Sequence, residues 1–181
     1  VAALDEMEPY GTGFLRPQLY MDGLRVEQLS EVGGGKHLKL RLSRGGKLLN
    51  GIFFSMTARR AAIALGDVVE VAFTPQINEF RGVRSVQLNL VDIRPSYECR
   101  QAIRQDLDMY NRFCSGVLAS SDAANLIPPR KEFVAVWRYL SANAQNGMIM
   151  DEFSVLARKI ARSANLPCSF IRTRLCLDVL E

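Results

Sequence analysis

The stretch Gly33-Gly34-Gly35-Lys36-His37-Leu38-Lys39-Leu40-Arg41-Leu42 decides how the first half of the chain folds, because three glycines open directly into a strict alternation. Successive side chains of an extended strand point to opposite faces. Leu38, Leu40 and Leu42 therefore share one face, and the side chains between them share the other. The pattern predicts a strand with one apolar face against a core and one basic face.

The basic face lies in a window that contains no acidic residue, from Val32 to Gly66. The window holds seven basic residues: Lys36, Lys39, Arg41, Arg44, Lys47, Arg59 and Arg60. A single lysine in such a place is more often part of a solvated strand face than of a site. The whole acid-free window favours binding to a polyanion, and nucleic acid is the commonest polyanion.

Size and composition limit the number of domains and the kinds of site that the chain can contain. A chain of 181 residues with 48% hydrophobic content can bury two small cores, so we expect two domains. The net charge of +4 is small, so local clustering of charge matters more than the total. Four cysteines without a CxxC pair and a single histidine argue against a zinc site and favour reduced thiols in the cytoplasm.

The ends and the hydropathy of the chain lead to three further expectations. No apolar run approaches the roughly 20 residues that a membrane span requires, so no membrane partner is expected. The chain begins at Val1 rather than at a methionine and ends within a predicted helix, so we expect a fragment of a longer protein. We also expect a monomer.

Five strands and one helix are predicted between residues 18 and 95. Strands are expected at Leu19–Val26 with a bulge at Asp22-Gly23, at His37–Leu42, at Leu48–Phe54 after an Arg44–Lys47 hairpin, at Asp67–Thr74, and at Arg84–Ile93 with Val86, Leu88 and Leu90 inward. A helix is expected at Met56–Leu65, capped by Ser55 or Thr57 and by Gly66, and a loop at Pro75–Gly82.

The order of three strands, a helix and two strands is that of an OB-fold barrel. An SH3-like barrel would not have a helix of three turns at that place. In an OB-fold, ligands lie across the second and third strands, between the loops that join strands one to two and four to five. The basic face of the second strand falls on that surface.

Beyond Pro95 the apolar period is helical. A helix is expected from Ser96 with an apolar stripe, a linker at Ala119–Ile127, and three short helices after Pro128-Pro129, separated at Gly147 and Pro167. The expected stripes are Ile103, Leu107, Tyr110, Cys114 and Val117; Phe133, Trp137, Leu140 and Ala144; Phe153, Leu156 and Ile160; and Phe170, Thr173, Leu177 and Leu180. The three helices fit a winged-helix arrangement, with a plain three-helix bundle as the alternative.

The predicted fold class is thus α+β, a five-stranded OB-fold barrel followed by a mainly helical domain. We expect an arm and barrel at 1–95, a connecting helix and linker at 96–127, and a helical domain at 128–181 that continues beyond the chain.

Four motifs resemble the OB-fold region of RecJ-type single-stranded-DNA-specific exonucleases. They are Glu8–Gly13, Gly35–Arg41, Ile77–Gly82 and Gln87–Pro95, and they follow the family's order across about residues 5 to 95. One departure is that Phe14-Leu15-Arg16-Pro17 stands where the family usually has Asn-Pro and a further proline, which affects the path of the arm. Residues 96–181 resemble the additional C-terminal region of longer members more loosely.

The resemblance implies a parent enzyme of DNA repair and recombination that degrades single-stranded DNA from the 5′ end. It also implies Mn²⁺ or Mg²⁺, held by Asp and His clusters in two catalytic domains that this chain lacks. We therefore expect no catalytic residue, no metal and no cofactor here, and no nuclease activity of the chain alone. The lone His37 lies between Lys36 and Lys39, where repulsion opposes a cation.

Candidate single-stranded-DNA-binding residues follow from both lines of reasoning. Phosphates are expected at Lys36, His37, Lys39, Arg41, Arg44, Lys47 and Arg84, and the loop between strands four and five is expected to expose Phe80 and Arg81. Base stacking is expected from Tyr10 or Phe80, with Phe53 as a further candidate. Tyr10 has the alternative role of pinning the arm, and either Phe53 or Phe54 must point inward.

A second class of function is a protein-docking module. The helical region carries eight basic residues: Arg130, Lys131, Arg138, Arg158, Lys159, Arg162, Arg172 and Arg174. By the family resemblance its partner would be single-stranded DNA-binding protein, whose acidic tail with a terminal apolar residue needs a basic-rimmed apolar pocket. A free-standing enzyme has no nucleophile, base and orienting group to support it.

Overall fold

The computed structural model describes residues 16–80 and 82–180, with Phe80 and Val83 described by their backbone only. The chain divides into two compact units, Val1–Tyr97 and Glu98–Glu181. The predicted stacking residue Tyr10 and the departure at residues 14–15 lie outside the described residues, as does Arg81. Each unit is considered by itself below.

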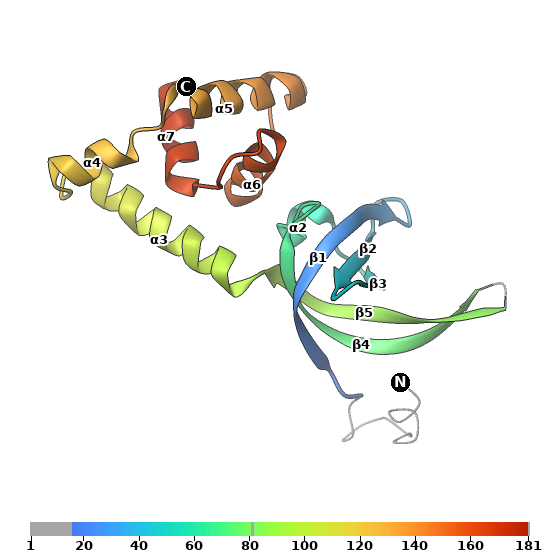
Figure 1. Ribbon diagram of the computed structural model, residues 1–181. Coiled ribbons are helices and arrows are strands. Elements are labelled where there is room, and N and C mark those ends of the chain that lie inside the picture. The colour runs from blue at the N-terminus through green and yellow to red at the C-terminus, as the bar shows by residue number, and fades with distance from the viewer. Residues whose placement is uncertain (1–15, 81, 181) are drawn as a thin grey trace. The chain divides into compact units, whose positions relative to one another are not determined.

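The first unit is a closed barrel of five strands (Figure 1). The strands are β1 (Leu19–Val32), β2 (His37–Arg44), β3 (Lys47–Phe53), β4 (Val68–Phe80) and β5 (Val83–Pro95), and one helix, α2 (Ala58–Ala61), lies between β3 and β4. The barrel closes in the order β1-β2-β3-β5-β4, with β3 and β5 parallel and the other pairs antiparallel. The predicted OB-fold is confirmed.

The barrel interior is filled by the apolar face of each strand. Its most buried members are Leu24, Val26, Leu38, Leu40, Leu42, Val69 and Val71, with Phe73, Leu88, Leu90 and Ile93 beside them. The alternation that begins at His37 therefore places its three leucines inside, as predicted. The bulge predicted at Asp22-Gly23 is also confirmed, because the register between β1 and β4 shifts between Met21 and Leu24.

The predicted loop at Pro75–Gly82 is wrong. β4 and β5 continue to pair as far as Phe80 and Val83, and Figure 1 shows them running on as a two-stranded ribbon. Pro75 favoured a loop because proline has no backbone N–H to donate to a neighbouring strand. The pairing of β1 with β4 ends at Phe73, however, so Pro75 has a neighbouring strand on one side only, which is β5. Val86 was predicted to point inward, but it pairs with Ile77 on this two-stranded ribbon and is 45% exposed.

The predicted helix at Met56–Leu65 is also too long. Thr57 caps α2 by accepting a hydrogen bond from the Arg60 N–H, but Ala62 adopts a left-handed conformation that ends the helix after one turn. The chain then turns back, because the buried Asp67 carboxylate accepts the Ala64 N–H at 2.7 Å. Ile63 is buried and Leu65 is exposed, so the apolar spacing of this segment reflects a packed turn rather than a three-turn helix.

The second unit consists of α3 (Tyr97–Cys114), α4 (Ser120–Leu126), α5 (Arg130–Asn143), α6 (Phe153–Ser163) and α7 (Phe170–Leu180). The helix expected from Ser96 is present, whereas the expected linker at Ala119–Ile127 is mostly the helix α4. Within residues 98–180 the only β-pairing is the isolated bridge between Gln145 and Met148. That part of the chain therefore has no β-hairpin wing, and it is a bundle of helices.

The core of the second unit uses only part of the predicted stripe of α5, because Phe133 and Leu140 pack against it but the buried residue of this helix lies outside the stripe. Val136 is its buried residue and packs with Leu156, Ile160 and Cys176, while Trp137 is 58% exposed. The predicted stripe of α3 has no buried member. Instead, α3 is tied to α7 by polar contacts, because Asp106 Oδ2 accepts the Phe170 N–H at 2.7 Å.

Candidate nucleic-acid interface

The strand register assembles one continuous polar surface on the outside of the barrel. Two rows of paired residues cross it from β1 through β2, β3 and β5 to β4. One row is Gln28, Arg41, Asn50, Gln87 and Gln76, and the other is Ser30, Lys39, Ile52, Asn89 and Thr74. We call these ten residues the amide face, after its five amide side chains.

The amide face contains positive charge and no carboxylate. Lys39 and Arg41 are exposed at its β2 side, and neither forms an ion pair with any residue of the described segments 16–80 and 82–180. Asn89 Nδ2 donates to Gln76 Oε1 at 2.7 Å, which ties the two rows together across β5 and β4. Unpaired cations beside neutral hydrogen-bonding groups suit a ligand with repeated negative charges.

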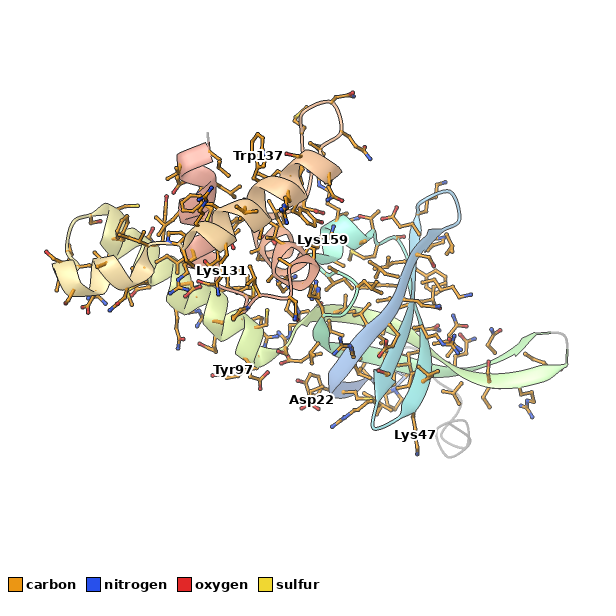
Figure 2. All side chains as sticks on the ribbon, turned by 45° about the horizontal axis from the view of Figure 1, so that its top comes forward. Asp22, Lys47, Tyr97, Lys131, Trp137 and Lys159 are labelled. Atoms are coloured by element: carbon orange, nitrogen blue, oxygen red, sulfur yellow. The ribbon has the colours of Figure 1, made fainter. Side chains whose placement is uncertain are left out.

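The remaining predicted cations fall into two groups. Lys36 lies exposed in the turn before β2, and Figure 2 shows Lys47 projecting from the end of the β2–β3 hairpin. Arg44 is paired with Asp22 at 3.0 Å, and Arg84 lies 4.0 Å from Glu79 on the β4–β5 ribbon. Lys39 and Arg41 thus lie together on one face, whereas Arg44 and Arg84 are paired with carboxylates at other places on the barrel.

His37 has a structural contact that the sequence did not indicate. Its Nδ1 accepts the Ser55 N–H at 3.0 Å, and its ring meets Phe54 edge to face with 5.2 Å between the centroids. Gly33 lies against the same ring, since a Cβ at that position would come within 2.9 Å of the His37 Cδ2. The ring is therefore held between the glycine turn and the segment after β3.

Several residues of this surface were missed by sequence reasoning. Asn50, Gln87 and Asn89 can be recognised as outward-facing from strand alternation, whereas Gln76 fell in the predicted loop at Pro75–Gly82. The parallel pairing of β3 with β5 that brings these amides together cannot be read locally. The choice between the two phenylalanines is also resolved, because Phe53 packs against the core and Phe54 is 54% exposed. Phe80 is the last residue of β4, paired with Val83, and not part of a long loop.

Another part of the barrel surface carries an exposed aromatic side chain beside two carboxylates. Tyr20 is exposed at the outer surface of β1, but its neighbours are Glu70 and Asp22. Desolvation, followed by the charge and hydrogen bond of Glu70, raises the pKa of Tyr20 above its usual value. Arg94 pairs with Glu70 at 3.3 Å. An aromatic side chain is thus present here as well, but it lies beside carboxylates that are each paired with an arginine, Asp22 with Arg44 and Glu70 with Arg94.

In the helical unit, the predicted basic residues divide in a similar way. Lys159 pairs with Asp151, Arg172 with Glu132, and Arg174 with Asp178. Arg158 is buried and donates to Ser154 Oγ at 3.2 Å, so it is not one of the exposed basic residues of this unit.

Three other basic residues, Arg130, Lys131 and Arg138, line a groove of about 870 Å³ between α5 and the end of α6. Its apolar lining includes Val134, Tyr139 and Leu166. Figure 2 shows Lys131 and Trp137 on α5. The groove combines apolar lining with a cationic rim, which is the chemistry that an acidic peptide with an apolar residue requires.

The described residues do not fit a divalent metal. No group of three or more His, Cys, Asp or Glu side chains within 16–80 and 82–180 could hold an ion, and the Nδ1 of His37 is already engaged. Among the same residues, none of the helices combines the length and the apolar character that a membrane span needs.

Comparisons with known proteins found relatives of part of the chain. A RecJ exonuclease of Dickeya dadantii, described as single-stranded-DNA-specific, is 35% identical over 94 residues, which are 51% of this chain and 16% of that protein. The crystal structure of Thermus thermophilus RecJ in complex with Mg²⁺ is 29% identical and covers 51% of this chain and 14% of its own, with a TM-score of 0.41. The second single-stranded DNA-binding protein of Mycobacterium smegmatis is 19% identical over 45% of this chain and 87% of its own, with a TM-score of 0.39.

The chain therefore spans about a sixth of the length of the RecJ relatives that it matches. The family model described as the RecJ OB domain matches residues 1–92, which is half of the chain. The resemblance carried by the four sequence motifs is thus confirmed, and the chain belongs to the RecJ OB domain family.

Proposed function

We propose that this chain is the single-stranded-DNA-binding, non-catalytic C-terminal portion of a 5′–3′ single-stranded-DNA-specific exonuclease of DNA repair and recombination. The observation that supports the proposal best is the amide face, which combines Lys39 and Arg41, without an ion pair in the described part of the chain, with neutral side chains and no carboxylate. Membership of the RecJ OB domain family supports the parent activity.

Phosphates would contact Lys39 and Arg41, while the neighbouring amides donate hydrogen bonds to the backbone or to exposed base edges. Such binding has little sequence preference, because every strand carries the same phosphates. A bound strand would be held at high local concentration beside the rest of the parent enzyme, so that one encounter serves several cleavage events.

The test is charge reversal on β2. Lys39→Glu combined with Arg41→Glu should strongly weaken binding of a fluorescein-labelled oligo-dT by the whole chain in an anisotropy titration. The slope of log affinity against log salt should fall in magnitude by about 0.7 for each phosphate contact that is lost. Both side chains point away from the core, so the change in stability should stay within about 1 kcal/mol.

A matched control makes the same change in total charge elsewhere. Arg104→Glu with Arg112→Glu on α3 replaces two exposed arginines that form no ion pair with the described residues. This control should retain most of the affinity. Equal losses in the two double variants would mean that only total charge matters, and the amide face would then not be the binding surface.

A second candidate function is docking of a protein with an acidic tail, and the groove of the helical unit favours it. Arg130, Lys131 and Arg138 at the rim would meet carboxylates, and the apolar lining would take a terminal apolar side chain. Single-stranded DNA-binding protein is the partner that we propose. Lys131→Glu with Arg138→Glu should abolish binding of its acidic tail peptide and leave oligo-dT binding intact. Loss of both activities together would contradict this division of roles.

A further inference from the structure

We infer that Phe54 is a stacking platform for one nucleobase and that His37 is the positioning residue that holds it. The inference rests on the proposed function, because it assigns the place of a base on the same surface to which the phosphates bind. It concerns two residues that the amide face does not include.

The first observation is the place of Phe54 in the register. The outward pairs along β2 and β3 are Arg41 with Asn50 and then Lys39 with Ile52, and the inward pair Leu38 with Phe53 follows. His37 and Phe54 come next, and the 5.2 Å between their ring centroids shows that they are neighbours across the two strands. The amide face therefore continues directly into an aromatic pair.

The second observation is that the backbone next to Phe54 is fixed by hydrogen bonds to both the N–H and the carbonyl of Ser55. The Ser55 N–H donates to His37 Nδ1 at 3.0 Å, and the Ser55 carbonyl accepts from Arg60 Nη1 at 3.1 Å. Ser55 has a positive φ of 54°, a conformation that a serine rarely adopts without such support. These contacts fix the backbone that presents the exposed ring.

The third observation is the charge around the ring. Phe54 is 54% exposed, and the exposed Arg59 lies on α2, which begins four residues after it. Glu31 is a carboxylate at this end of the barrel, and its Oε1 is occupied by the Ala58 N–H at 3.0 Å. A base stacked on Phe54 would thus have the Arg60 guanidinium, which donates to the Ser55 carbonyl, near its flanking phosphates. The Glu31 carboxylate keeps its charge but is held by the Ala58 amide.

Tyr20 provides an internal comparison. Its exposed fraction of 58% is close to that of Phe54, and it also lies on the outer surface of the barrel. It lies beside Glu70 and Asp22, however, which are paired with Arg94 and Arg44, and it is not part of the rows that carry Lys39 and Arg41. If exposure alone made a stacking platform, the two aromatics would be equivalent, and an experiment can compare them directly.

The experiment uses an indole as a reporter. Trp137 is the only tryptophan of the chain, so Trp137→Phe removes the background fluorescence. In that background, Phe54→Trp should give a signal that oligo-dT quenches by stacking, while an abasic oligomer of the same length should bind without quenching. Tyr20→Trp in the same background should show no quenching with either oligomer.

Affinity gives an independent measure. Phe54→Leu should weaken binding of oligo-dT about fivefold or more and leave binding of the abasic oligomer unchanged. His37→Ala should show the same pattern, and His37→Asn, whose side-chain oxygen can accept the Ser55 N–H, should recover part of the loss. Lys39→Glu should weaken both oligomers, because it removes a phosphate contact.

The outcomes separate the two proposals. Binding of oligo-dT without quenching of the indole at position 54, together with an unchanged affinity in Phe54→Leu, would overturn the stacking role while the phosphate-binding role stands. No binding of either oligomer by the unaltered chain would overturn the proposed function itself.

Discussion

Arg44 donates to the carboxylate of Asp22 across 3.0 Å, and this pair joins the end of β2 to the bulge of β1. Both side chains are more than half exposed. An exposed pair of this kind adds little to stability, but it occupies a cation that lies on the same strand as Lys39 and Arg41. Asp22 therefore limits how much positive charge β2 offers to a polyanion.

Asp22→Asn should consequently strengthen binding of single-stranded DNA at low salt, since it releases Arg44 and removes a repulsive carboxylate. We expect a salt slope steeper by as much as about 0.7, which corresponds to one additional phosphate contact. Asp108→Asn on α3 makes the same change in net charge in the helical unit and should have a much smaller effect. Fluorescence anisotropy at several salt concentrations measures both. An unchanged salt slope in Asp22→Asn would show that Arg44 does not reach the bound strand.

A second prediction concerns the stability of the helical unit. Asp106 Oδ2 accepts the N–H groups of Phe170 and Ile171 at 2.7 and 3.1 Å, so a carboxylate of α3 caps the first turn of α7. Asp106→Ala should lower the free energy of unfolding by about 1–3 kcal/mol, because two amide donors in a partly buried place lose their acceptor. Asp108→Ala on the same helix is exposed and should cost less than about 0.5 kcal/mol. Urea unfolding followed by circular dichroism compares the two, and equal effects would refute the capping role.

The sequence was sufficient for those elements whose signal is local. The strand that contains Leu38, Leu40 and Leu42 and the Arg44–Lys47 hairpin both follow from alternation and glycine placement. The helix at Met56–Leu65 was overestimated because a packed turn that buries Ile63 and Ala64 has an apolar spacing like that of a helix. The helix α2 ends because Ala62 adopts a left-handed conformation, and an alanine in the sequence does not predict that conformation.

The site was predictable only in part, for a related reason. The charge of Lys39 and Arg41 could be assigned to one face because the alternation is local. The amides joined to them depend on the pairing of β3 with β5, whose residues are more than 30 positions apart. The partners of Arg44 and His37 depend on where β1 and the segment after β3 come to lie, so no local pattern could separate those two side chains from the unpaired cations.

A third prediction uses the pH dependence of a thiol. Cys114 and Cys168 are both exposed residues, but partial enclosure of the thiol, followed by the nearby Cys99, raises the pKa of Cys168 to about 11. The thiolate is the reactive form. Iodoacetamide should therefore modify Cys168 only slowly at pH 8, and its rate of modification should keep rising as the pH approaches 11. Peptide mass spectrometry after short exposures measures this rate, and a rate that levels off near pH 9 would contradict the raised pKa.

The raised thiol pKa values also make the folded chain less stable at high pH. The folded chain holds the Cys168 proton more tightly than the unfolded chain, and burial likewise raises the pKa of Cys176 to about 11. This contribution to the free energy of unfolding is fully present below the ordinary thiol pKa and is lost as the pH rises through the folded value. Cys176→Ala should reduce the fall in stability between about pH 9 and 11, as urea midpoints across that range would show.

The last prediction tests how firmly the glycine turn holds the His37 ring. Gly33 and Gly34 have nearly the same backbone conformation, with φ of +64° and +68°, so an alanine at either position incurs a similar cost for a left-handed residue. Their surroundings differ. A Cβ at Gly33 would meet the His37 Cδ2 at 2.9 Å, whereas a Cβ at Gly34 would have no atom within 4 Å. His37 cannot easily turn away, because its Nδ1 is held by the Ser55 N–H.

Gly34→Ala should thus lower the free energy of unfolding by about 1 kcal/mol, and Gly33→Ala by clearly more, because the second change adds a displaced ring and a strained hydrogen bond to the same backbone cost. The excess should disappear when His37 is also changed to alanine, since the clash then has no partner. Thermal unfolding of the three single variants and the Gly33→Ala, His37→Ala pair gives this coupling. Equal destabilisation by the two glycine changes would mean that the ring is free to move, and His37 could then not hold the segment that presents Phe54.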